Sequence, residues 1–208
     1  MNDHARALTV ACGLILWGFI AIALSRRAET SATDAVLPLP WASATCVLGL
    51  AAISVIFRSP LAAATCGAAC IGLAAAAAAD LRTGYLFDAL TMPAAALVTA
   101  LAIGGGATDR ACAGVLMVIG PFGALVVYSR GRWMGLGDVK AMYALAVAFG
   151  PIESFLAIFV ACVCAIASVI VAGRFAARCE IRFGPYLAVG AAFALVAGDQ
   201  FSWRIAGA

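Results

Sequence analysis

A series of long apolar runs constrains the fold of this chain more than any other feature. The runs fall at residues 7–25, 36–57, 61–79, 89–105, 111–128, 135–150, 152–173 and 184–202. About 20 residues of helix cross a hydrocarbon core about 30 Å thick, and the chain is 65% hydrophobic and 11% charged, unlike a soluble domain. The runs do not alternate between apolar and polar residues as the strands of a membrane barrel do. Helices are the other structure that satisfies the backbone hydrogen-bonding groups in lipid. The sequence therefore predicts an all-α polytopic membrane protein with about eight transmembrane helices.

Positive charges lie mainly on one side of the predicted topology. With eight spans, one side holds 9 of the 13 lysine and arginine residues, and the other holds 13 − 9 = 4. The nine are Arg26, Arg27, Arg82, Arg130, Arg132, Lys140, Arg174, Arg178 and Arg182. If residues 135–173 crossed only once, the last three would change sides and the split would be 6 to 7. The positive-inside rule therefore favours two crossings with a turn at Gly150–Pro151, and it predicts that both termini lie outside the cytoplasm.

The segments between the spans are short, so we expect one integral membrane domain over residues 1–208. The longest polar stretch, 26–34, is too short to bury a core of its own. The first run follows Arg6 as a secretory signal would, but it is longer than the roughly 7 to 15 apolar residues usual for a cleaved signal, so a retained span is favoured. Gly72 and Ala76 have the spacing at which small side chains let helices approach closely, which predicts a packing seam.

Two carboxylates stand at the ends of predicted spans. Asp80 follows the third run, and Asp138 lies in the segment GLGDVK, residues 135–140, at the start of the sixth. Ionisable residues at the edge of the hydrocarbon are costly and commonly functional. Two complete spans, 89–105 and 111–128, separate the aspartates. Both must therefore lie on the same face, which the positive charges predict to be cytoplasmic.

A pair of aspartates indicates acid/base chemistry. Hydrolysis of a peptide by two carboxylates needs one ionised group, which takes a proton from water, and one protonated group, which donates to the scissile carbonyl. Like charges at close range do not both ionise readily, so proximity creates this division. The sequence does not say which of Asp80 and Asp138 is the base. Gly135 and Gly137 tolerate unusual backbone angles and could let an extended substrate lie close to Asp138.

The charged residues near these positions also have structural interpretations. Asp138 is well placed to cap the helix that follows two glycines, and Asp80 could pair with Arg82 and anchor the end of a span. Asp88 is predicted to be the N-cap of the fourth span rather than a third acid. Lys140 is expected to extend to the membrane interface, and a role in steadying the aspartates or contacting substrate is the alternative.

The eight cysteines do not have the spacing of a metal site. Seven of them fall within or at the ends of apolar runs, Cys179 alone lies in a loop, and no CxxC occurs. We therefore predict no metal site and no cofactor. The net charge of +3 follows from topology, so we expect the lipid bilayer, and no nucleic acid, as the partner of the basic residues.

Three segments resemble the prepilin peptidases, also called type IV leader peptidases, which are GxGD-type membrane aspartic proteases. Residues 80–83 (DLRT) and 88–93 (DALTMP) are similar to the first aspartate motif of that family, residues 135–140 to its second, and residues 183–186 (FGPY) to the segment that opens its last helix. The resemblance covers about residues 80–194. Three motifs in this order are far more specific than GxGD alone.

The resemblance implies an aspartic endopeptidase that removes the short basic leader of type IV prepilins or pseudopilins at the cytoplasmic face of the bacterial inner membrane. Asp80 and Asp138 would be catalytic. Substrate binding or structural support would come from Gly135, Gly137, Lys140, Arg82, Gly184 and Pro185. The implied partners are the leader peptide and the pilus assembly or secretion machinery. Residues 61–208 would form the peptidase core, and residues 1–60 two spans outside the resemblance.

The sequence departs from the family at two points. Many members have a proline where this chain has Phe87. Larger bifunctional members carry a cytoplasmic insert with paired CxxC motifs, linked to N-methylation of the processed pilin, between their first two spans. Here that loop is only about residues 26–35 and contains no cysteine. The chain thus resembles the short, peptidase-only branch of tight-adherence pilus systems, and methyltransferase activity is not expected.

Two other classes of protein stay open on the sequence alone. A small proton- or cation-coupled transporter also needs acids within the membrane, and secretion machines include non-enzymatic assembly factors. Transporters often show inverted repeats and helices broken at the midplane. This sequence shows neither clearly, and its acids lie at the ends of spans.

Overall fold

The computed structural model describes residues 60–84, 86, 88–171 and 181–206, together with the isolated positions 12, 14–16, 18 and 20. Of Pro60, Arg82 and residues 198–206 it describes the backbone alone. The predicted spans at 7–25 and 36–57 lie almost wholly outside these residues. The total of eight transmembrane helices therefore stays a prediction.

Five helices make up the main described part of the chain, which contains no strand. They are α3 (Pro60–Thr83), α4 (Asp88–Gly104), α5 (Thr108–Ser129), α6 (Leu136–Val171) and α7 (Gly184–Ala206). Among the described residues, three helices are long and apolar enough to cross a membrane, at Leu61–Leu81, Thr108–Ser129 and Leu136–Val171. Shorter apolar helices cover Asp88–Gly104 and Gly184–Ala197. The predicted all-helical class is confirmed for this part of the chain.

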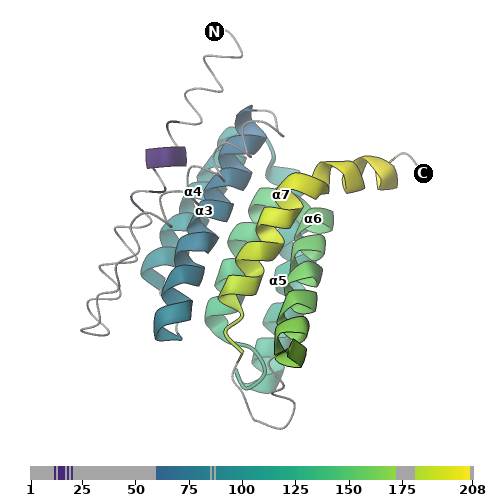
Figure 1. The fold of residues 1–208 in the computed structure, drawn as a ribbon. Helices are drawn as coiled ribbons and strands as arrows, with labels where there is room; N and C mark the ends of the chain where they lie inside the picture. The colour runs from purple at the N-terminus through teal and green to yellow at the C-terminus, as the bar shows by residue number, and fades with distance from the viewer. Residues whose placement is uncertain are drawn as a thin grey trace.

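The helices pack side by side in a bundle (Figure 1). Helix α7 lies between α3 and α6 and contacts both, α4 packs against α3 and α6, and α5 packs mainly against α6. Helices α3 and α5 end, and α4, α6 and α7 begin, at one end of the bundle. We call this the aspartate end; it includes the connection 130–135 and the described parts of the connections before α4 and α7.

Helix α6 reverses direction at Gly150, so its two arms, residues 136–149 and 151–171, run antiparallel. Gly150 has φ 74° and ψ −173°, a combination open almost only to glycine. Ser154 Oγ donates to the carbonyl oxygen of Leu145 at 3.2 Å, whereas the same two positions on a straight helix are about 13.5 Å apart along the axis. The turn that the sequence predicts here is confirmed.

An ion pair between the half-exposed Arg110 and the buried Glu153 holds this turn at the end of the bundle opposite the aspartate end. Arg110, in the first turn of α5, donates from Nη2 to the Phe149 carbonyl oxygen at 2.6 Å and to Glu153 Oε1 at 2.8 Å. Glu153 is only 1% exposed, and a buried carboxylate needs a partner of this kind. The pair fixes α5 against the turn of α6. The sequence analysis gave neither Arg110 nor Glu153 a structural role.

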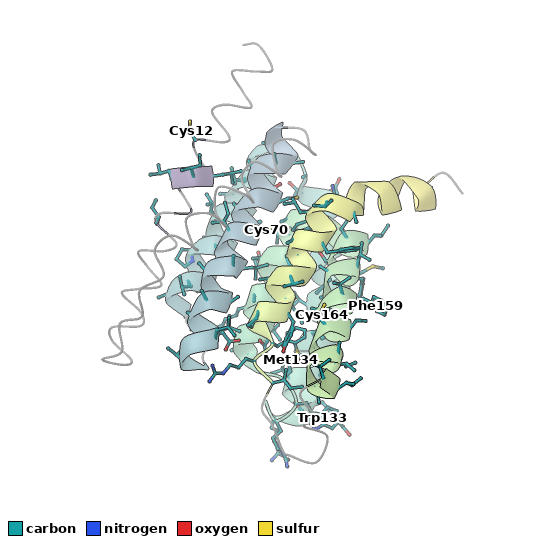
Figure 2. The ribbon with its side chains drawn as sticks, viewed as in Figure 1. Cys12, Cys70, Trp133, Met134, Phe159 and Cys164 are labelled. Carbon is teal, nitrogen blue, oxygen red and sulfur yellow. The ribbon has the colours of Figure 1, made fainter. Side chains whose placement is uncertain are left out.

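Many small residues line the inside of the bundle beside larger core side chains, and many large apolar residues also face its outside. Gly72 and Ala76 of α3 are both buried, as the predicted packing seam requires. Phe159, on the second arm of α6, is 66% exposed and points away from the bundle (Figure 2). Many large apolar side chains of the outer helices are exposed in the same way. An apolar exterior of this extent is rare in soluble monomers and suits a protein surrounded by lipid.

Gly150→Ala is expected to lower the free energy of unfolding by about 1 to 3 kcal/mol, because a side chain is strained at this backbone conformation. Its β-carbon would also lie 2.7 Å from Arg110 Cγ. The midpoint of thermal unfolding in detergent measures the effect. Gly120→Ala is the matched control, since its β-carbon, in the middle of α5, would meet nothing within 4 Å. Equal midpoints for Gly150→Ala and the unaltered protein would contradict the turn.

Candidate active site

Asp80 lies in the last turn of α3, and a glycine fixes the end of that helix. Gly84 has φ 74°, and its N–H donates to the Asp80 carbonyl oxygen at 2.8 Å. This is a helix C-cap, which requires positive φ and therefore favours glycine. Thr83 Oγ1 also donates to the Ala79 carbonyl oxygen at 2.9 Å. Helix α3 thus ends one turn after Asp80, at the aspartate end.

The Asp80 carboxylate is buried between α3 and α7. Asp80 is 4% exposed, and its Oδ2 accepts a hydrogen bond of 3.1 Å from the backbone N–H of Gly184, the first residue of α7. A β-carbon at position 184 would lie 2.8 Å from the same oxygen, so only glycine allows this approach without displacement. The positive end of the α7 dipole also favours a carboxylate here.

Arg182 lies beside Asp80 on the segment that precedes α7. Its guanidinium donates to the carbonyl oxygen of Leu81 and interacts electrostatically with the Asp80 carboxylate. A β-carbon at Gly84 would lie 3.8 Å from Arg182 Nε, so the guanidinium covers the end of α3. The sequence analysis counted Arg182 only as a topological charge. Its position immediately before the FGPY segment is the signal that could have placed it at the site.

Asp138 lies in the first turn of α6. The backbone N–H of Gly135 hydrogen-bonds to its carboxyl group, as in the reciprocal half of a capping box. A β-carbon at position 135 would lie 3.4 Å from Asp138 Oδ2, at the lower limit of an ordinary van der Waals contact. The capping interpretation of Asp138 therefore holds in the structure, and it does not compete with a chemical role because the group remains half-exposed.

The two aspartates lie at the same end of the bundle. The carboxyl groups of Asp138 and Asp80 interact electrostatically, although α4 and α5 separate them in the sequence. Two carboxyl groups in such proximity tend to share a single proton, because ionising both brings like charges together. The arrangement can therefore offer one proton acceptor and one proton donor at the same time.

The sequence suggested that Gly137 could let a substrate lie close to Asp138, but the structure places Leu86 of the same chain against it. A β-carbon there would lie 3.0 Å from Leu86 Cβ, in the connection between α3 and α4. The close approach at Gly137 is thus made by the protein's own chain, and glycine allows that connection to pack on the start of α6. Gly135, by contrast, is exposed and leaves space beside Asp138.

The connection that carries Gly135 is anchored at both of its ends. Arg130, with φ 51°, caps α5 through backbone hydrogen bonds to Val126 and Val127. Met134 packs against the hydrophobic core, whereas Trp133 is exposed and lies further from the bundle (Figure 2). These contacts hold the chain in place directly before the first turn of α6.

Lys140 forms an ion pair with Asp88, with Nζ 2.7 Å from Oδ1. Asp88 is the first residue of α4, so the pair connects the start of α4 to the first turns of α6 beside Asp138. The Lys140 ammonium is bound to a carboxylate rather than extended alone to the interface. The Asp88 side chain is 65% exposed, and exposed pairs of this kind are worth about 0 to 1 kcal/mol.

The remaining candidate residues have peripheral positions. Pro185 is the second residue of α7 and is half-buried; its missing N–H costs nothing in a first helical turn. Arg82 lies in the last turn of α3, but its side chain is outside the described residues, so its pairing with Asp80 stays a prediction. No group of three or more His, Cys, Asp or Glu that could hold a metal ion occurs within the described ranges.

A model of the type IV leader peptidase family matches residues 67–170, half of the chain. The chain belongs to the type IV leader peptidase family. The matched segment includes Asp80 and Asp138, and it ends before α7. Searches of curated proteins and of solved structures found no match. The chain is therefore a peptidase, as the motif resemblance implied, and its described part is a largely apolar helical bundle.

Gly184→Ala should lower the rate of leader cleavage by this peptidase, because the new β-carbon, 2.8 Å from Asp80 Oδ2, must displace the carboxylate. A displacement of about 1 Å in such a site can cost roughly 10²-fold in rate. The initial rate is compared with that of Gly123→Ala, whose β-carbon would make only an ordinary contact with Ile119 in α5. A folded Gly184→Ala protein with an unchanged rate would exclude a role for the Asp80 position.

Proposed function

We propose that this peptidase is an aspartic endopeptidase that removes the N-terminal leader of type IV prepilins or pseudopilins. The observation that carries the proposal is that Asp138 and the buried Asp80 lie at the same end of the bundle and interact electrostatically. Membership of the leader peptidase family supplies the reaction class, and the aspartate pair supplies groups able to perform it. A site at the ends of the helices would also lie near the membrane surface, where a short basic leader at the cytoplasmic face is expected.

We assign the chemistry to Asp80 and Asp138. One carboxylate takes a proton from water while the water oxygen attacks the scissile carbonyl carbon, and the other carboxyl group donates its proton to the carbonyl oxygen. Both groups are held by backbone N–H donors, from Gly184 and Gly135 respectively. Side chains held in this way stay oriented toward the same space.

Support for this pair is assigned to the residues around it. Gly137 allows the α3–α4 connection to pack against α6, and Lys140 ties α6 to α4 through Asp88. Pro185 favours the start of α7 next to Gly184. We retain Arg82 as a supporting residue because of its place in the last turn of α3.

The distribution of charge supports a cytoplasmic active site in the inner membrane. Arg130, Arg132, Lys140 and Arg182 belong to the aspartate end, while Arg110 lies at the other end. An excess of basic residues marks the cytoplasmic side of membrane proteins. We therefore propose a multi-pass protein of about eight spans, a single domain over residues 1–208 with its peptidase core at 61–208.

The substrate defines the further partners. A processed pilin subunit must pass to pilus assembly or secretion machinery, which we propose as the functional context. The sequence contains no CxxC motif, so we assign the chain the peptidase reaction alone, without methyl transfer and without a metal or other cofactor.

Asp80→Asn and Asp138→Asn should each reduce conversion of a co-expressed cognate prepilin by at least about 10²-fold, because each removes one of the two groups that transfer protons. Immunoblots of precursor and mature pilin measure the conversion, and membrane fractionation confirms insertion of each variant. Asp109→Asn is the matched control, since Asp109 is exposed in the first turn of α5 at the opposite end. Full conversion by both site variants would refute the mechanism, and acid-dependent proton flux in liposomes without cleavage would indicate a transporter.

A further inference from the structure

The two aspartates differ in burial and in the charged groups that act on them. Asp80 is 4% exposed, whereas Asp138 is half-exposed. Both lie next to the N-terminus of a helix, and each carboxyl group is bound by one backbone N–H, from Gly184 for Asp80 and from Gly135 for Asp138. These features favour the ionised form of both groups, whereas burial opposes the ionised form of each. A guanidinium, that of Arg182, acts on Asp80, whereas the charged group that acts on Asp138 is Asp80 itself. The environment is therefore asymmetric.

Arg182 is held in place by a contact other than that with the carboxylate. Its Nη1 donates to the carbonyl oxygen of Leu81, the residue after Asp80, and its Nε lies near Gly84. A guanidinium that binds the end of α3 keeps a fixed relation to the Asp80 side chain on the same turn. The side chain is exposed, so solvent reduces the strength of the interaction without abolishing it.

Among the described residues, the cation that acts on Asp80 is Arg182. Arg130 and Arg132, in the connection before α6, are exposed and are not among the groups that act on either aspartate. From α4 and α6 come Asp88 and Lys140, which are bound to each other at 2.7 Å and largely cancel. From α6 comes Asp138, whose negative charge opposes ionisation of Asp80. The segment before α7 contributes Arg182. The Arg82 side chain, on α3 itself, is outside the described residues.

We propose that Arg182 is a positioning residue that holds Asp80 in its ionised form, so that Asp80 is the base and Asp138 the acid of the hydrolysis. The inference rests on the proposed function and deepens it. Asp80 takes a proton from the attacking water as the new C–O bond forms, and Asp138 gives its proton to the carbonyl oxygen. When the C–N bond of the tetrahedral diol breaks, Asp80 gives its proton to the amine nitrogen and Asp138 takes one back from a hydroxyl group.

The test is the pH dependence of kcat and KM for Arg182→Gln with a prepilin substrate in detergent. Activity at low pH is lost when the base becomes protonated. Without the guanidinium, Asp80 binds a proton at higher pH, so the acidic limb of kcat should move up by about 0.5 to 1 pH unit, with KM little changed. On that limb the rate falls by about 3- to 10-fold, and raising the pH should restore it.

Two further variants separate charge from structure. Arg182→Lys retains a cation and should keep the acidic limb of the unaltered enzyme; this variant also decides the question if Arg182→Gln does not fold. Arg132→Gln removes one exposed arginine from the same end of the bundle and should leave the limb in place. Three results would each overturn the inference. For Arg182→Gln they are a rate reduced equally at all pH values and a displaced alkaline limb. For Arg182→Lys it is an acidic limb displaced by a full pH unit.

Failure of the proposed role of Arg182 can be distinguished from failure of the proposed aspartic mechanism. Loss of cleavage in Asp80→Asn and Asp138→Asn, together with an unmoved acidic limb in Arg182→Gln, would overturn the role of Arg182 and leave the aspartic mechanism intact. Cleavage that survives both aspartate substitutions would overturn both.

Discussion

The hydrogen bond from the Gly184 backbone to the Asp80 carboxylate is the contact on which the rest of the site depends. It joins two residues 104 positions apart in the chain, and it satisfies a carboxylate that would be costly to bury without a partner. For α7 to begin there, the second arm of α6 must first return the chain to the aspartate end. Tyr186 and Ser168, whose hydroxyl groups lie 2.6 Å apart, show that it does so.

Charged side chains are placed at the two ends of the bundle, and apolar residues fill the middle. At the end opposite the aspartates, Arg110 and Glu153 pair across the turn of α6. At the aspartate end, Asp80, Asp138 and Arg182 lie together. The first group is a salt bridge of opposite charges that fixes a turn, whereas in the second two like charges interact across the site. Only the second has the unfavourable interaction that a proton-sharing site requires.

Glycines allow this arrangement for three separate physical reasons. Gly150 and Gly84 adopt positive φ, so they reverse or end a helix where other residues would be strained. Gly184 and Gly137 admit a neighbouring carboxylate and a neighbouring side chain at distances that a β-carbon would obstruct. Gly135 leaves the Asp138 carboxyl group accessible. The GxGD motif thus combines close packing at its second glycine with openness at its first.

The sequence alone determined the helices and the shared face of the aspartates. Apolar length predicted α4 at 89–105, against Asp88–Gly104 in the structure. Charge counting predicted the turn at Gly150, because arginine and lysine are in excess on the cytoplasmic side of a membrane. Hydropathy placed the start of α5 at 111 rather than Thr108, since it does not register polar residues in a first helical turn.

Tertiary structure alone decided which side chains meet. The contacts of Arg182 with Leu81, Glu153 with Arg110 and Gly137 with Leu86 join segments whose proximity depends on how helices pack. Spacing along one helix carries no information about the side chain that a neighbouring helix presents, so periodicity and motif could name the aspartates but not the groups that orient them.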